Sequence, residues 1–162
     1  MLETPTHYTL VAGRAEGATP LNAFDNALLA AHVGNVNLLH VSSILPPRSQ
    51  YVERLTIPPG SLVPIAYASI IDDHPGALIT AGVAVGLSKD AFGVIMEFSG
   101  HCDEETAQQQ LRAMIEEAFR VRKMPLADIR LITIAHRVER QGCAFAAVPL
   151  WYATVEEGGS VR

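Results

Sequence analysis

The sequence predicts an α+β fold, and three observations support this prediction. The chain has 162 residues, of which 49% are hydrophobic and 18% charged, as expected of a globular chain with a sizeable core. No internal repeat or linker divides it, so we expect a single domain over residues 1–162. The expected order is strand, helix, several strands, helix and two strands. Most neighbouring strands are expected to form hairpins, which favours α+β over a doubly wound parallel sheet.

The first helix is predicted from its start signal. Thr19 is a suitable N-cap, and Pro20 suits the first helical position. We expect the helix to run to about Ala31, and Gly34 to provide a left-handed exit. Asp25 falls near the edge of the buried face, where a carboxylate is either solvated or, in a cleft, a partner for a cation. The apolar face is predicted to contain Leu21, Phe24, Leu28 and Ala31.

The central stretch of the chain is an apolar run at residues 36–41 that ends at Ser42 and Ser43, shortly before Pro46 and Pro47. We interpret the run as a buried core strand. The prolines cannot donate hydrogen bonds to a sheet. The strand before the serines holds the backbone on one side, and the two prolines stiffen it on the other. This arrangement favours strain in the peptide bond between Ser42 and Ser43. The alternative is that two small polar residues simply end a strand.

Further elements follow from the alternation of apolar runs and turn residues. The proline-rich segment 46–60 is expected to be a loop with a short edge strand. A second helix should begin after Asp103 as N-cap and end before Pro125. Gly82 and Gly86 indicate a bulge or a close backbone contact within their strand. The remaining strands are predicted at 8–13, 62–71, 78–87, 93–99, 129–138 and 143–152.

Charge and cysteine content exclude several classes of protein. A net charge of −5 and a pI near 5.6 argue against a nucleic-acid partner and fit a cationic substrate weakly. Cys102 and Cys143 form neither a disulfide framework nor a zinc pattern, and the six histidines lack metal-ligand spacing, so we expect no metal. We treat each histidine as structural or surface. With no membrane-spanning run and no signal-peptide pattern, we expect no membrane partner and a cytoplasmic location.

Six blocks of the sequence, taken together and in order, resemble the pyruvoyl-dependent arginine decarboxylases. They are residues 17–25 (GATPLNAFD), 34–38 (GNVNL), 41–47 (VSSILPP), 60–67 (GSLVPIAY), 95–97 (IME) and 142–147 (GCAFAA). The resemblance spreads over residues 13–152, so it is far more specific than any one block. The loop at 48–57 does not match, which leaves substrate access and specificity open.

The resemblance implies a four-layer αββα sandwich and a homotrimer, or a dimer of trimers, with sites between subunits. It also implies self-cleavage between Ser42 and Ser43 into residues 1–42 and 43–162. The cofactor would be a covalent pyruvoyl group formed from Ser43, with no metal and no pyridoxal phosphate. The implied reaction converts L-arginine to agmatine and CO₂ through a Schiff base with that group.

The chemistry of decarboxylation agrees with such a cofactor. Loss of CO₂ from an amino acid leaves a carbanion at the α-carbon, which needs an electron sink that no ordinary side chain provides. A pyridoxal site would need a larger fold and a glycine-rich phosphate cup, and the sequence contains no such cup. A decarboxylase of this length therefore favours a cofactor made from its own backbone.

The resemblance also assigns roles to single residues. Ser43, Glu97 and Asn37 would be catalytic, with Glu97 as the acid. Burial among apolar neighbours would raise the pKa of Glu97, although a solvated glutamate on a strand is equally compatible with the pattern. Asn37 is an even number of residues from Ser43, which places both on one face of a regular strand. Asp25 would bind the guanidinium group of the substrate. The pocket would be lined by Leu21, Leu28, Gly34, Val36 and Ile44, which as bare residues are equally compatible with plain core.

Two alternatives to arginine decarboxylation stay open from the sequence. One is a pyruvoyl-dependent decarboxylase of another amino acid such as histidine. The other is a non-catalytic oligomeric homologue that has kept the fold. Agmatine can serve polyamine biosynthesis or acid resistance, and the sequence does not decide between these pathways.

Overall fold

The computed structural model describes residues 3–153. Its helices are α1 (Pro20–Ala30) and α2 (Glu104–Val121). Its strands are β1 (His7–Tyr8), β2 (Val11–Glu16), β3 (Asn37–His40), β4 (Ile44–Leu45), β5 (Gln50–Tyr51), β6 (Leu62–Asp72), β7 (Leu78–Leu87), β8 (Gly93–Gly100), β9 (Asp128–Arg137) and β10 (Gly142–Trp151).

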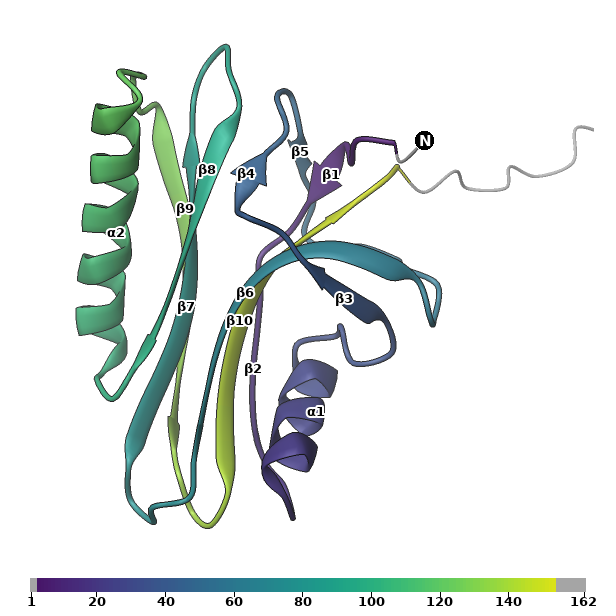
Figure 1. The fold of residues 1–162 in the computed structure, drawn as a ribbon, viewed down its shortest axis with the longest axis vertical. Coiled ribbons are helices and arrows are strands. Elements are labelled where there is room, and N and C mark those ends of the chain that lie inside the picture. Colours follow the sequence, from purple (N-terminus) through teal and green to yellow (C-terminus); the bar gives the residue numbers. More distant parts are fainter. Residues whose placement is uncertain (1–2, 154–162) are drawn as a thin grey trace, which may run out of the picture.

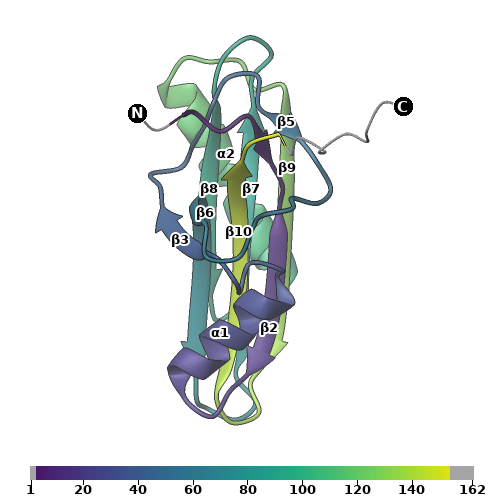
Figure 2. The same cartoon turned by 90° about the vertical axis from the view of Figure 1, so that its right-hand side faces the viewer.

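These elements form four layers (Figure 1). The first sheet has the strand order β3-β6-β10-β1-β5, with β2 also paired to β10, and the second has the order β4-β8-β7-β9. The two sheets pack face to face, with α1 on the outer face of the first and α2 on the outer face of the second. Figure 2 shows α1 lying across β2 and β10. The predicted α+β class and the αββα arrangement are confirmed.

Three apolar cores hold the layers together. The largest lies between the sheets and includes Ile79, Val83 and Ile95, which are fully buried. A second lies between α1 and the first sheet, and a third between α2 and the second sheet. Burial of this apolar surface is the main favourable contribution to folding. Since each helix packs on one sheet only, its opposite face is left uncovered within the chain.

Both predicted helix starts are confirmed. The Thr19 hydroxyl accepts a hydrogen bond from the backbone N–H of Asn22 at 3.2 Å, and Pro20 occupies the first helical position. The Asp103 carboxylate accepts from the N–H of Thr106 at 2.8 Å. These caps satisfy backbone donors that the first helical turn leaves without intrahelical partners.

The predicted apolar face of α1 is confirmed at Leu28 and Ala31, which are buried, and at Phe24, which packs partly buried on the same core, but it is wrong at Leu21. Leu21 is 73% exposed, and the buried residues are Ala23, Ala27 and Leu28. The helix approaches β2 closely, because a Cβ atom on Gly13 would lie 2.2 Å from the carbonyl oxygen of Ala27. At that separation only small side chains fit between helix and strand, which suits Ala27 and Ala31.

The exit from α1 also differs from the prediction. The left-handed residue is His32, with φ of 62°, and Gly34 does not have a positive φ. Gly34 instead lies against Leu29, whose Cδ2 atom would be 2.6 Å from a Cβ at that position. The absence of a side chain at Gly34 is thus required for packing and not for a left-handed turn.

The prediction that most neighbouring strands form hairpins within one sheet is wrong. It holds for β7 and β8, which pair antiparallel. The turns after β6 and β9 instead carry the chain from one sheet to the other. The predicted strand at 8–13 is also interrupted, because β1 pairs with β5 and β10 while β2 pairs with β10 alone.

The strand before the two serines is an edge strand and not the buried core strand that its apolar run predicts. In β3, Leu39 is 44% exposed, and the strand ends at His40. It pairs in parallel with β6 on one side only. Periodicity cannot distinguish a run that is covered on both faces from one that lies at a sheet edge. The chain then crosses to β4, which is the edge strand of the second sheet.

Candidate active site

Ser43 lies where the chain passes from the edge of the first sheet to the edge of the second (Figure 1). Its φ is 74°, in the left-handed region that residues other than glycine rarely adopt. Its carbonyl accepts a hydrogen bond from the N–H of Ile95 at 2.9 Å, which fixes it against β8. The conformation is thus strained directly after the Ser42–Ser43 peptide bond, and the surrounding strands hold it in place.

Glu97 of β8 is the partner of Ser43. The hydroxyl of Ser43 donates a hydrogen bond to Oε1 of Glu97. Burial raises the pKa of Glu97, although this hydrogen bond and the nearby His40 lower it in part. The structure therefore joins two of the predicted catalytic residues in one half-buried pair, whose hydroxyl and carboxyl groups can exchange a proton.

His40 is a neighbour of this pair that the sequence did not single out. Its ring stacks on Tyr67, with centroids 4.4 Å apart and an interplanar angle of 27°. Its positive charge, when present, lowers the pKa of Glu97. No spacing signal marks His40, because the chain separation to Glu97 is large and only the pairing of sheet edges brings the two together.

Asn37 is not brought to Ser43 within this chain. Its side-chain amide donates to the carbonyl of Gly60 at 2.9 Å, and the residue is exposed. The even spacing between Asn37 and Ser43 does not place them on one face, because β3 ends at His40 and the chain then turns. Its predicted catalytic role is not tested by this arrangement.

The predicted substrate-binding residues lie in two places. Leu21 and Asp25 are exposed on α1, and Leu28 of the same helix is buried against the first sheet. Gly34 and Val36 line a cavity of about 340 Å³ whose opposite wall is the loop at 55–59. These five residues lie on the outer side of the first sheet, whereas Glu97 belongs to the second, so the first sheet stands between the two groups.

Ile44 is the predicted binding residue that lies beside the serine pair. It pairs with Val94 of β8 and is 41% exposed. A branched apolar side chain this open to solvent next to Ser43 is suited to contact a bound molecule or a second chain.

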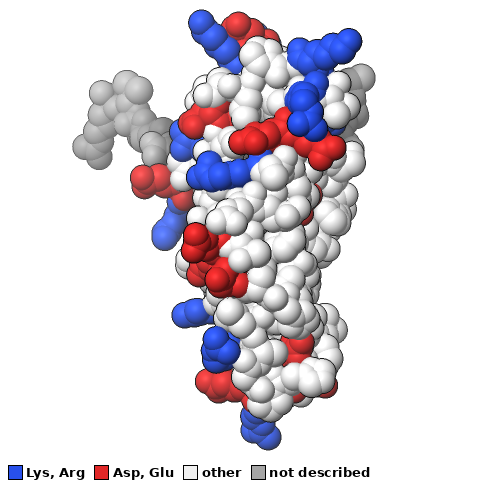
Figure 3. Space-filling model, turned by 90° about the vertical axis from the view of Figure 1, so that its left-hand side faces the viewer, with Lys and Arg blue, Asp and Glu red and all other residues white. Residues whose placement is uncertain are grey.

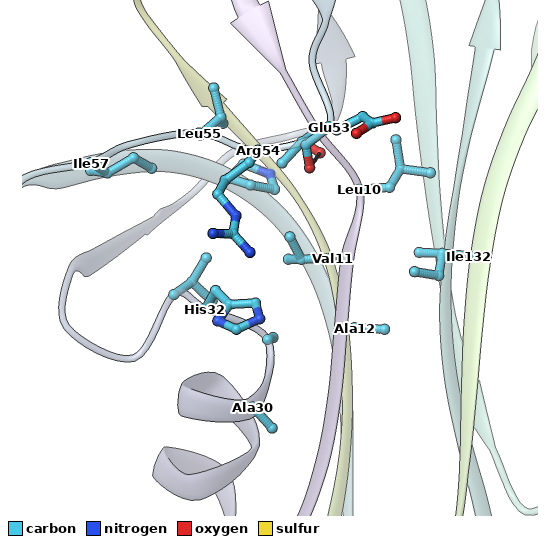
Figure 4. A pocket seen from close by; sticks show the side chains of 14 residues that line it. Leu10, Val11, Ala12, Ala30, His32, Glu53, Arg54, Leu55, Ile57 and Ile132 are labelled. Carbon is cyan, nitrogen blue, oxygen red and sulfur yellow. Dashed lines mark hydrogen bonds between the residues drawn. The ribbon is translucent and has the colours of Figure 1, made fainter. Parts of the chain in front are cut away.

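A separate cavity of about 430 Å³ lies between β2, the end of α1 and the loop at 53–57. In Figure 4 the guanidinium group of Arg54 points toward His32 across this cavity, and Ile132 forms a wall. None of the predicted site residues lines it. The cavity is therefore distinct from the Ser43–Glu97 pair.

A cluster of potential metal ligands lies at the β6–β7 turn, where the sequence predicted no metal. Oxygen and nitrogen atoms of Asp72, Asp73 and His74 lie within 4.8 Å of one another. Asp72 also accepts from His101, at 2.5 Å between Oδ2 and Nε2. The two histidines hold the pKa of Asp72 well below its usual range. These contacts satisfy the carboxylate without an ion, and the cluster is not part of the Ser43–Glu97 site.

Comparison with known proteins identifies the family. A sequence model of the family described as pyruvoyl-dependent arginine decarboxylase matches residues 7–157. A Methanocaldococcus jannaschii protein named pyruvoyl-dependent arginine decarboxylase is 48% identical over 150 residues, which cover 91% of each chain. Proteins of the same name from Pyrococcus abyssi and Methanococcus maripaludis are 42% and 41% identical over 152 residues, covering 96% and 93% of their lengths. The chain belongs to the pyruvoyl-dependent arginine decarboxylase family.

The residues at the crossing between the sheets fit the cofactor of this family. A pyruvoyl group made from the chain needs a serine whose hydroxyl is free to react and whose preceding peptide bond is accessible. Ser43 has a hydroxyl directed at a carboxyl group, and Ser42 is exposed.

In the part of the chain that the structure describes, no helix is long and apolar enough to cross a membrane.

Proposed function

We propose that this chain cleaves itself between Ser42 and Ser43 and then converts L-arginine to agmatine and CO₂. The single observation that carries the proposal is the hydrogen bond from the Ser43 hydroxyl to Glu97, made at a residue with a left-handed backbone. A strained peptide bond, a nucleophile and a base meet at this point. All three favour self-cleavage.

Cleavage begins when Ser43 Oγ attacks the carbonyl carbon of Ser42 and its proton passes to Glu97. The peptide nitrogen then leaves as the free amine of residue 43, so that an ester replaces the amide. Loss of the Cα proton of residue 43 breaks the Cβ–Oγ bond. This step releases residues 1–42 with a carboxylate at Ser42 and leaves dehydroalanine at position 43. Water converts dehydroalanine to a pyruvoyl group and ammonia, so atoms balance without an oxidant.

Glu97 serves a second time during decarboxylation. The pyruvoyl group supplies the electron sink that holds the electron pair left when CO₂ departs. A protonated Glu97 then provides the proton for the α-carbon of the substrate. Burial raises the pKa of Glu97, which favours the protonated form that this step requires.

The substrate side of the site is proposed to come from a second copy of the chain. Asp25 is exposed on α1, and the first sheet separates that helix from Glu97 of the same chain. A cyclic homotrimer, or a dimer of such trimers, allows α1 of one subunit to lie against the Ser43 region of the next. The exposed Leu21 and Ile44 are apolar side chains that such an interface would cover.

The first experiment is an intact mass spectrum of the purified, denatured protein. We expect two fragments, residues 1–42 and 43–162, the larger being lighter by about 17 Da than plain hydrolysis gives, because ammonia is lost. Ser43→Ala should remain one chain and carry no carbonyl that reacts with phenylhydrazine. A wild-type chain that stays unbroken after incubation would favour the non-catalytic homologue.

Asp25→Asn separates arginine from other substrates. We expect complete self-cleavage and a KM for arginine raised about 100-fold, because a carboxylate–guanidinium pair is lost. Glu116→Gln, at an exposed acid on α2, is the matched control. An unchanged KM for Asp25→Asn would exclude the guanidinium role and make histidine the next substrate to assay.

The predicted cytoplasmic location and the absence of nucleic-acid and membrane partners stay predictions.

A further inference from the structure

A second cavity, of about 460 Å³, lies beside the strand that follows the cleavage site. Its walls come from β1, the β4–β5 connection, the β7–β8 hairpin and β9. Figure 1 places the hairpin and the β4–β5 connection at the same end of the molecule. Neither Ser43 nor Glu97 lines this cavity, so it is a separate site, although its size is that of a small-molecule pocket.

Cationic side chains are concentrated around this cavity, although the net charge of the whole chain is −5. Three cationic side chains line it, Arg48, Lys89 and Arg130, against one acid, Asp90. Within residues 3–153, none of the three forms an ion pair with a carboxylate. Figure 3, which views the face over α2, shows positive and negative side chains interspersed, with several Lys and Arg at the upper end. Three cations against one acid give the cavity a net positive lining, which favours an anion over a cation.

The surroundings hold these cations in place. The Arg130 guanidinium carbon lies 4.4 Å from the centroid of the Tyr51 ring, and Tyr51 packs edge-on against the buried Tyr8 at 5.7 Å. This stacking orients the Arg130 guanidinium group at the wall of the cavity. Arg48 has a left-handed backbone, with φ of 62°. The chain after it is fixed to β1, since Gln50 N–H donates to the carbonyl of Thr6 at 2.9 Å.

We propose that this cavity binds a small dianion, either a phosphate ester or a dicarboxylate, through Arg48, Lys89 and Arg130. The positive lining excludes arginine and agmatine, whose guanidinium groups it would repel. A bound dianion would connect the β4–β5 connection to the β7–β8 hairpin. Because Leu45 of β4 pairs with Gly93 of β8 at the wall of the cavity, the ligand would stabilise the pairing that holds Ser43 near Glu97. This inference does not depend on the substrate proposed above.

Titration calorimetry and thermal melting with inorganic phosphate and with succinate test the proposal. Both are done on the full chain at constant ionic strength, because salt screens exposed charges. We expect saturable binding of at least one probe and a higher melting temperature. Lys89→Ala and Arg48→Ala should each weaken binding about tenfold, because each removes a charge-assisted hydrogen bond.

The matched control is Arg112→Ala, which removes an exposed arginine of α2 outside the cavity and should bind like the wild type. Preference for phosphate assigns a phosphate ester, and preference for succinate assigns a dicarboxylate. Equal weakening in all three variants, or no saturable binding of either probe up to about 10 mM, would overturn the proposal. Circular dichroism melts establish that each variant is folded.

Discussion

Ser43 and Glu97 form a hydrogen-bonded pair in which each residue affects the proton affinity of the other. The carboxyl group accepts the hydroxyl proton of Ser43, and the hydroxyl lowers the pKa that burial of Glu97 raises. In the proposed self-cleavage the ionised carboxylate is the useful form, since it takes a proton. The proposed cleavage would remove the hydroxyl at position 43, and the protonated acid would then be the useful form. The loss of that hydrogen bond therefore favours the form that decarboxylation needs.

The pH dependence of turnover tests this role of Glu97. Burial raises its pKa, so the protonated donor persists above the usual range of a carboxyl group and is lost as pH rises through the raised pKa. We expect kcat to fall with rising pH through that range. Glu97→Gln should lower kcat by about 10²–10⁴-fold and remove this pH dependence.

The measurement is agmatine formation from pH 4 to 9, divided by the pyruvoyl content titrated with phenylhydrazine, so that incomplete processing of the variant is corrected. A Glu97→Gln enzyme that keeps the wild-type pH profile per pyruvoyl group would exclude Glu97 as the proton donor.

At the scale of elements, glycines set how closely the layers approach. A Cβ on Gly86 would lie 2.5 Å from Cε2 of Phe119, and one on Gly82 would lie 2.8 Å from Cδ1 of Leu111. The close contact predicted for these glycines is thus made with α2. On the other side of the molecule, Gly13 has the same role for α1. The position of α1 bears on the proposed substrate site, because this helix carries Asp25.

Gly13→Ala should displace α1. The added methyl group would meet backbone atoms of Ala27 and Ala31, which cannot rotate away as a side chain can. We expect a loss of about 2–4 kcal/mol in the free energy of unfolding, measured by urea denaturation. Gly100→Ala is the control, because its nearest neighbour is the ring end of Phe98 at 3.3 Å. Equal stability of the two variants would mean that α1 is not held by this close packing.

The β6–β7 turn and the β8–α2 connection are joined by Asp72. Its hydrogen bond to His74 raises the pKa of that histidine. A raised pKa in the folded state gives stability that is present below the unfolded value of about 6.5 and is lost as pH rises through the folded value. We therefore expect Asp72→Asn to lower the melting temperature more at pH 6 than at pH 9. A difference that is the same at both pH values would exclude the His74 contribution.

At the scale of the whole molecule, one chain presents the proposed site residues in two separate places. The proposed cleavage residues are at the crossing between the sheet edges, and the proposed guanidinium-binding Asp25 is on the outer side of the first sheet. Both places have exposed apolar side chains, Leu21 beside Asp25 and Ile44 beside Ser43. A rotationally symmetric assembly joins unlike surfaces of neighbouring copies, and this is the arrangement that the proposed site requires.

Mixing two variants that are impaired in different residues of the proposed site tests this arrangement, at an arginine concentration near the wild-type KM, where both variants alone have little activity. Ser43→Ala lacks the pyruvoyl group, and Asp25→Asn lacks the guanidinium partner. If each site takes Ser43 from one subunit and Asp25 from the next, a co-expressed or co-refolded 1:1 mixture of the two variants should regain about one quarter of wild-type activity at that arginine concentration, because random assembly completes about one site in four. Size-exclusion chromatography with light scattering gives the assembly. Mixed oligomers without restored activity would place both residues in one subunit's site or exclude the role of Asp25.

The sequence by itself determined the α+β class and both helix starts, and it supplied the serine pair that we propose as the cleavage site. These properties are local: Thr19 and Asp103 cap the helices that follow them, and Ser42-Ser43 is contiguous in the chain. The family resemblance rests on the same kind of contiguous blocks. Helix caps and contiguous motifs depend only on residues that are close together in the chain, so the sequence alone predicts them.

Only the tertiary structure decided how the serine pair is held and what surrounds it. The apolar run before it forms an edge strand because only β6 pairs with it, and Ser43 meets Glu97 because β4 pairs with β8. His40 becomes a neighbour of Glu97 because these sheet edges meet, and α1 lies close to β2 because Gly13 has no side chain. Each outcome depends on contacts between residues distant in the chain, which local propensity and periodicity do not encode.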